Sequence, residues 1–169
     1  MILAVDPGPT ESAWIIHGAP TATTSTSWQG RGFAKSPNAD VLDMVRTKAK
    51  HGDRADRLVV EMIASYGMPV GREVFETVLW IGRFVEAWNF GSCRDADLLY
   101  RTTVKLHLCN STRAKDGNVR QALIDRFGGK SAIGTKEQPG PLYGVAGDVW
   151  AALAVAVTFS DAQSKARAA

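Results

Sequence analysis

The chain has 169 residues, which suits one domain of ordinary size that buries a core without disulfides. Hydrophobic residues make up 45% and charged residues 22%, as is typical of soluble globular proteins. No stretch approaches the roughly 20 apolar residues of a membrane span, and the opening residues lack the basic flank of a signal peptide. We therefore expect a cytoplasmic protein with one domain over residues 1–163 and a frayed tail over residues 164–169.

The cysteines and histidines show no metal-ligand spacing. Cys93 and Cys109 are typical of packed thiols in a reducing compartment, although a disulfide between them remains possible. His17, His51 and His107 lie far apart in the sequence. Any bound metal is therefore expected to have oxygen ligands.

The net charge is only +3, but the charge is unevenly distributed. Between Arg101 and Lys136 there are eight Lys and Arg residues, against the two acids Asp116 and Asp125. Such a local excess favours a polyanionic partner through phosphate contacts. A solvated helix face explains it equally well.

The first half of the chain predicts strands followed by helices. Apolar runs predict strands over 2–5 and 12–17, and a Thr- and Ser-rich run predicts a third over 21–28, all three antiparallel. Asn38 is expected to cap a helix over 39–50.

A buried strand over 57–63 and a loop over 66–72 are expected next, followed by a long helix over 73–89. The apolar face predicted for this helix consists of Val74, Val78, Ile81 and Val85.

The second half predicts a strand over 97–102, a short helical turn near 104–105 and an amphipathic helix over 116–127. A loop over 131–147 leads to an almost wholly apolar, buried helix over 148–159. The order of elements indicates an α/β domain with a mixed sheet.

Three acids stand where an unpaired carboxylate is costly. Asp6 ends a buried strand, Glu61 lies within one, and Asp148 opens the apolar helix. Gathered together, three carboxylates would repel one another, and a pair of Mg²⁺ ions would remove that repulsion. Two such ions can also activate a water and stabilise the leaving oxygen of a phosphodiester. Taken singly, Asp6 is equally well a turn former and Asp148 a helix cap.

Four segments in register resemble RuvC-type Holliday junction resolvases. They are Ile2-Leu-Ala-Val-Asp6-Pro-Gly8, Leu58-Val-Val-Glu61, Tyr100-Arg-Thr-Thr-Val-Lys105 with Lys115 and Val119 beyond it, and Gly147-Asp148 leading into Leu153-Ala-Val-Ala-Val-Thr158. The resemblance implies an RNase H-like fold, with three antiparallel N-terminal strands and further parallel strands flanked by helices. The compact form is similar to phage or prophage members of the family in bacterial hosts.

The resemblance also implies a site with two Mg²⁺ ions, for which Mn²⁺ would substitute. Asp6 would bridge both ions, and Glu61 and Asp148 would each complete one coordination shell. Lys105 and Lys115 match basic positions that contact the scissile phosphate, although simple surface solvation also explains them.

One departure from the family concerns a fourth acid or histidine, usually found one helical turn after the third acid. Ala151 occupies that position here. The site would then use three carboxylates or recruit another, such as Asp116 or Glu11.

The loop after Glu61 supplies a residue that wedges between bases in the family. Tyr66 and Met68 are candidates for this role, because an aromatic ring stacks on a base and a methionine can intercalate; packing onto the core is an equal alternative. The full set expected to contact DNA is Tyr66, Met68, Arg72, Arg101, Lys105, Arg113, Lys115 and Arg120. Trp80 and Trp88 share a helix face that is a candidate dimer seam.

The function implied is metal-dependent resolution of four-way DNA junctions by a C2 homodimer, without a nucleotide cofactor. A nuclease with broader branched-DNA or RNA–DNA hybrid substrates is an alternative, and so is a non-catalytic junction-binding relative. An actin-like ATPase also opens with Asp-x-Gly after a strand, but that fold needs two such domains.

Overall fold

The computed structural model describes residues 1–18, 32–51, 55–65, 67 and 69–168, except for the side chain of residue 51. The strands are β1 (Ile2–Asp6), β2 (Glu11–His17), β3 (Phe33–Pro37), β4 (Arg57–Met62) and β5 (Asp97–Tyr100). The helices are α1 (Asn38–His51), α2 (Arg72–Ser92), α3 (Arg101–Cys109), α4 (Asp116–Arg126), the 3₁₀ turn η1 (Gly129–Ala132) and α5 (Val149–Ala168).

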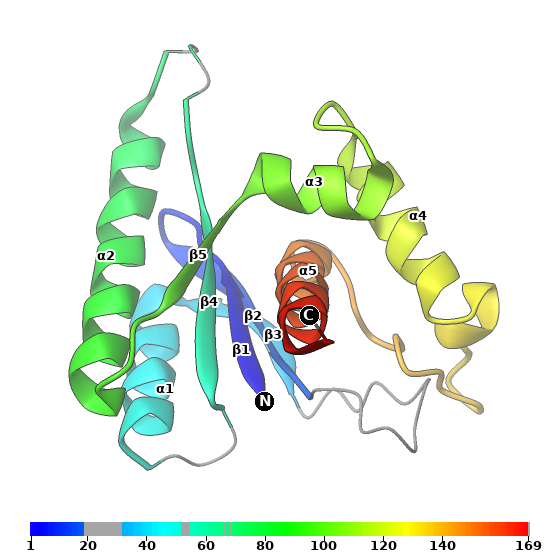
Figure 1. Cartoon of the computed structure of the whole chain (residues 1–169), viewed down its shortest axis with the longest axis horizontal. Coiled ribbons are helices and arrows are strands. Elements are labelled where there is room, and N and C mark those ends of the chain that lie inside the picture. Colours follow the sequence, from blue (N-terminus) through cyan, green and yellow to red (C-terminus); the bar gives the residue numbers. More distant parts are fainter. Residues whose placement is uncertain (19–31, 52–54, 66, 68, 169) are drawn as a thin grey trace.

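The strands form one mixed sheet in the order β3-β2-β1-β4-β5. β1 pairs antiparallel with β2, which pairs antiparallel with β3, whereas β4 runs parallel to both β1 and β5. In Figure 1, α1 and α2 lie on one side of the sheet, and α5 lies on the other with α3 and α4 beyond it. The expected mixed sheet flanked by helices is confirmed.

Side chains alternate between the two faces of the central strands. Leu3 and Val5 pack toward α1 and α2, whereas Ile2 and Ala4 pack toward α5. Asp6, which follows Ala4 at the same parity, therefore points to the α5 side. This alternation decides which face of the sheet carries the acidic side chains.

Helix α5 forms the core of its side of the sheet. Between Val149 and Ser160 every residue except Ala151 is buried, because the helix is enclosed by the sheet and by α3 and α4. A helix that is apolar all round requires this environment. The helix continues to Ala168, so the segment expected to fray from residue 164 is helical as far as the structure describes it.

Several predicted boundaries differ from the structure. The strand expected over 21–28 lies outside the described residues, and β3 occupies Phe33–Pro37, a segment to which the sequence assigned no element. The strand expected over 97–102 ends at Tyr100, and the expected short turn is the nine-residue helix α3. The reason is tertiary: Val104 is buried in the core beneath α5, which a helix from Arg101 allows.

The buried face of α2 is rotated from the prediction. Thr77, Ile81, Phe84 and Trp88 are buried, whereas Val78 is exposed. The pattern of valines was misleading because larger side chains at the next helical positions fill the space above the sheet.

Asn38 has a different role from the expected helix cap. Its side-chain amide donates to the backbone oxygen of Gly8, at 2.9 Å, and its Oδ1 accepts from the Ser12 hydroxyl. Asn38 is buried and begins α1. It therefore fastens the turn that follows Asp6 to the start of α1.

The structure also bears on the state of the two cysteines and on membrane-spanning helices. Cys93 and Cys109 are free thiols. Within the described ranges, every helix is too short or too polar to cross a bilayer.

Candidate active site

Asp6 and Glu61 meet where β1 and β4 end. The parallel register pairs Val5 with Val60, so the next residues along the two strands are Asp6 and Glu61. Both point to the α5 side, and their side chains share a hydrogen bond. The Glu61 side chain is only 4% exposed. Two carboxyl groups are thus brought together at a nearly dry position.

The protonation of this pair follows from burial of both carboxyl groups and from the charge of Glu61 beside Asp6. Burial, and then the charge of Glu61, raises the pKa of Asp6 from 3.8 to about 8, with a smaller contribution from Asp148. Burial also raises the pKa of Glu61, and Arg101 opposes that rise. A hydrogen bond between two carboxyl groups needs a proton, so near neutral pH the pair holds one proton, mainly on Asp6.

Asp148 stands directly before α5, above the same face of the sheet. In the strand register, Asp6 is opposite Ala13, and Ala13 is opposite Lys35. The methyl group of Ala13 leaves room for the start of α5 over this row, and there the Asp148 carboxylate contacts Lys35 Nζ at 2.9 Å. Its charge still contributes to the raised pKa of Asp6. The third acid is therefore near the pair but bonded to a lysine.

Arg101 holds the other side of the pair. It begins α3 directly after β5, and its Nη1 donates to both Glu61 oxygens at 3.1 and 3.0 Å. Its Nη2 donates to Asp116 at 2.7 Å, and Lys105 Nζ lies 3.8 Å from the same carboxylate. Arg101 was expected to contact DNA, and the structure places it inward between two acids.

The three carboxylates are suitable ligands for a divalent cation, but they do not converge on one point in this structure. Across the residues described, no three Asp, Glu, His or Cys side chains converge closely enough to hold an ion. Asp6 and Glu61 converge, and Asp148 is turned to Lys35. That ion pair is solvent-exposed on both partners, 46% for Lys35 and 56% for Asp148. Exposed pairs contribute at most about 1 kcal/mol, so releasing Asp148 from Lys35 costs little.

The basic residues predicted to contact DNA differ in their burial and in the side chains that they contact. Lys105 is partly buried, and Lys115 directly precedes α4 next to Asp116. Arg120 lies over the Trp150 ring at 5.0 Å, close to the start of α5. Arg72 lies at the start of α2, where it pairs with Glu76 at 2.6 Å.

The remaining three predicted DNA contacts are Arg113, Tyr66 and Met68. Arg113 is exposed in the segment between α3 and α4. Tyr66 and Met68 lie outside the described residues.

Sequence reasoning missed Lys35 and the inward role of Arg101. No motif marks Lys35, because only the strand register brings it into line with Asp6. The two candidates for an extra ligand are both engaged: Asp116 with Arg101, and Glu11 with Lys35 at 3.9 Å. Ala151 lies one helical turn after Asp148, as expected, and is partly exposed.

Comparison with known proteins identifies the fold. No protein-family model and no curated protein matches the sequence. Among solved structures, this chain is similar to Thermus thermophilus RuvC, with 17% identity, a TM-score of 0.61, and coverage of 97% of this chain and 96% of that one. It is also similar to T. thermophilus RuvC in complex with a Holliday junction substrate, with 18% identity, a TM-score of 0.62, and coverage of 93% and 90%. The chain therefore has the RuvC-like, RNase H-like fold.

The proton held by the carboxyl pair makes stability depend on pH. In the folded protein Asp6 keeps its proton up to a pKa of about 8, whereas in the unfolded chain it releases it near 3.8. The folded state binds more protons between these values, so the free energy of unfolding falls as the pH rises from about 4 to 8. We expect Asp6→Asn to remove this part of the decline.

Urea unfolding in EDTA at pH 5 and pH 8 measures the effect. Asp40→Asn, an equal substitution of an exposed acid on α1, serves as the control and should keep the wild-type difference between the two pH values. An unchanged difference in Asp6→Asn would contradict the shared proton.

Proposed function

We propose that this chain is a divalent-metal-dependent endonuclease that resolves four-way DNA junctions. The observation that carries the proposal is the pairing of Asp6 with buried Glu61 at the ends of two parallel strands, with Asp148 nearby. Strand ends of this kind do not gather carboxylates for stability, because each adds desolvation and repulsion. The fold shared with a RuvC whose structure contains a Holliday junction supports the choice of substrate.

Asp6, Glu61 and Asp148 would hold the metal, with Asp6 between the other two. Two bound Mg²⁺ or Mn²⁺ ions would stabilise the charge that develops on the attacking and leaving oxygens of the phosphodiester. Burial of Glu61 shields part of this site from solvent. Release of the shared proton frees the Asp6 carboxylate to act as a ligand.

The reaction proposed is hydrolysis by in-line attack of water on phosphorus. The water oxygen forms the new P–O bond, the bond from phosphorus to the 3′ oxygen breaks, and a proton passes to that oxygen. The products are a 5′-phosphate and a 3′-hydroxyl. Lys105 and Lys115, on the α3–α4 side of the pair, would bind the phosphate and offset its growing negative charge.

The DNA backbone would approach from the side of α3 and α4. Arg113, Lys115 and Arg120 are exposed there, and each offers a cation to a phosphate. We place Tyr66 and Met68, which follow Glu61 in the chain, on the same substrate. The protein would work in the cytoplasm of a bacterial host, where such DNA occurs, and its phage origin stays a prediction.

A junction-binding protein without nuclease activity is the second candidate. Two observations favour it: Ala151 stands where the family carries a further ligand, and Arg101 neutralises Glu61. Both candidates bind junctions, so cleavage distinguishes them. A nuclease with broader branched-DNA or hybrid substrates would use the same residues.

Resolution of a junction needs two symmetric cuts, so the proposal includes a homodimer. The seam expected from Trp80 and Trp88 is wrong: Trp88 is buried against the sheet, and Trp80 packs on Phe84. The exposed apolar side chains lie elsewhere on α2. Phe75 is 64%, Leu79 63% and Phe90 84% exposed.

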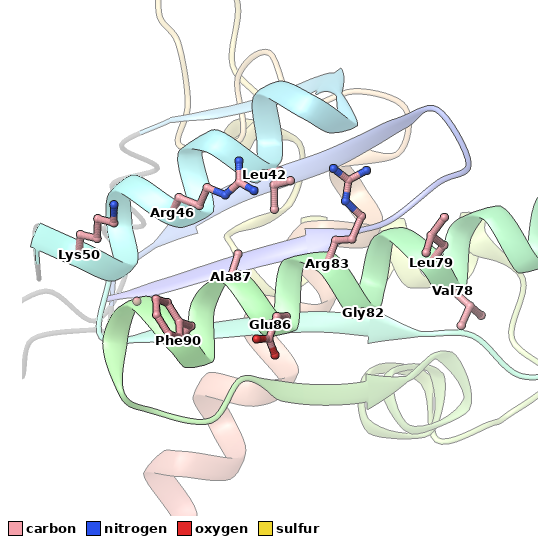
Figure 2. A pocket seen from close by; sticks show the side chains of 11 residues that line it. Leu42, Arg46, Lys50, Val78, Leu79, Gly82, Arg83, Glu86, Ala87 and Phe90 are labelled. Atoms are coloured by element: carbon pink, nitrogen blue, oxygen red, sulfur yellow. The ribbon is translucent and has the colours of Figure 1, made fainter.

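Two of them, Leu79 and Phe90, line a groove of about 670 Å³ between α1 and α2 (Figure 2). Leu42, Arg46 and Lys50 line it from α1, and Val78, Leu79, Gly82, Arg83, Glu86, Ala87, Phe90 and Gly91 line it from α2. The exposed apolar side chains of α2 form a stripe that extends to both sides of Gly82. Phe75 lies seven residues before Gly82, and Phe90 lies eight residues after it.

A second copy of α2 laid antiparallel across Gly82 complements this stripe. Phe75 of each copy then meets Phe90 of the other, and Gly82 lets the two backbones approach closely. Self-complementarity of this kind is what a C2 interface requires, so we propose that α2 forms the seam.

The central test of the proposal is cleavage of a synthetic four-way junction with and without Mg²⁺. We expect wild-type protein to cut it only with metal, and Asp6→Asn to bind it equally well while cutting at least about 100-fold more slowly, since charge stabilisation at the phosphate is lost. Gel shift and denaturing gels measure the two properties.

Linear duplex and an RNA–DNA hybrid accompany the junction as substrates, and Asp40→Asn is the matched variant that should cut normally. Wild-type cleavage by Asp6→Asn would end the metal-site argument. Junction binding without cleavage by wild type, in either Mg²⁺ or Mn²⁺, would establish the second candidate instead.

For the dimer, we expect Leu79→Glu to weaken self-association by at least about 30-fold, because the substitution places unpaired charges at the centre of the seam. Sedimentation velocity over a dilution series measures the change. Leu106→Glu, which alters an exposed leucine on α3, should leave the dimer intact. A wild-type monomer at all concentrations, or an unaffected Leu79→Glu dimer, would exclude this seam.

A further inference from the structure

Arg101 differs from the other cations around the acidic pair. Lys35 and Lys105 approach only exposed carboxylates, whereas Arg101 reaches Glu61, whose side chain is only 4% exposed. A single Nη1 contacts both Glu61 oxygens, at 3.0 and 3.1 Å. These are the oxygens that the proposed metal site requires.

We propose that Arg101 is an internal counter-ion of the site: its guanidinium occupies the cation position at Glu61, and a divalent metal binds only when it withdraws. The inference rests on the proposed metal site and names a residue that regulates it. Arg101 acts here as a positioning residue, since it controls the availability of Glu61.

Glu61 cannot accept both cations in the arrangement that the structure has. Its carboxylate bonds to Asp6 on one side and to Arg101 on the other, and little of it faces water. A metal ion at these oxygens would lie beside the positive charge of Arg101, whose Nη1 is 3.0 Å from one of them, and the low dielectric of the site makes that unfavourable. The guanidinium must move before the ion can bind.

Asp116 gives the guanidinium a place to move to. Nη2 of Arg101 donates to Asp116 at 2.7 Å, and the Asp116 side chain is largely exposed at the start of α4. The side chain of Arg101 can therefore turn away from Glu61 while it keeps this second bond. The hydrogen bond from Arg101 lowers the pKa of Asp116, so Asp116 stays ionised and available as an anchor.

The exchange has a thermodynamic consequence. If Glu61 is free of Arg101 for only a fraction of the time, the apparent dissociation constant for metal equals the intrinsic constant divided by that fraction. A variant that cannot bond to Glu61 removes this penalty. Such a variant should bind metal more tightly than wild type, although its metal ligands are the same.

Calorimetric titration of the DNA-free protein with Mn²⁺ tests the inference. We expect Arg101→Met to bind Mn²⁺ at least ten-fold more tightly than wild type. Arg101→Lys keeps the charge but not the forked geometry, so its affinity should lie between the two. Arg167→Gln, an exposed arginine near the end of α5, should match wild type.

Two further measurements separate this effect from a structural one. Loss of a charge partner for buried Glu61 destabilises Arg101→Met without metal, so Mn²⁺ should raise its melting temperature more than that of wild type. Adding Glu61→Gln to Arg101→Met should cancel the gain in affinity. If Arg101→Met is too unstable to purify, Arg101→Lys carries the test alone.

The inference is overturned if neither Arg101 variant binds Mn²⁺ more tightly than wild type, which includes the case in which none of the proteins binds it. It is supported if both variants bind more tightly in the expected order. Tighter Mn²⁺ binding with no junction cleavage by any variant would count against the proposed nuclease function and leave the role of Arg101 standing.

Discussion

The structure depends on one costly contact, the meeting of two carboxyl groups on adjacent parallel strands. Asp6 and Glu61 share a hydrogen bond beneath the start of α5, where burial raises the pKa of both carboxyl groups and the charge of Glu61 raises the pKa of Asp6 further. Buried like charges destabilise a fold unless protons, cations or metal ions neutralise them. A proton on Asp6 and the guanidinium of Arg101 on Glu61 provide the first two kinds of neutralisation.

The neighbouring elements place those neutralising groups by strand order. β3 and β2 bring Lys35 into the row of Asp6 through the small Ala13, and β5 ends where α3 presents Arg101 to Glu61. Asn38 fixes the turn after Asp6 to the other side of the sheet. The site is therefore held by three different parts of the chain, and the rigid core beneath α5 sets its geometry.

The sequence predicted the elements that carry the acids because each has a strong local signal. Short apolar runs mark the strands that end near Asp6 and hold Glu61, and an apolar helix follows Asp148. It did not predict Lys35 or the inward turn of Arg101, because both contacts arise from register between strands far apart in the chain. The exposed face of α2 was misplaced for a related reason, since only packing against the sheet reveals which aromatic rings are buried.

The charges of the site nearly balance without metal. With Asp6 protonated, the three positive charges of Lys35, Arg101 and Lys105 offset most of the negative charge of four acids, which are Glu11, Glu61, Asp116 and Asp148. The fold can therefore form before any ion binds. Two divalent ions that replace the proton of Asp6 would leave the same site strongly positive, and a positive site attracts a phosphate backbone. Metal and DNA are then expected to bind cooperatively, because each neutralises the charge that the other introduces.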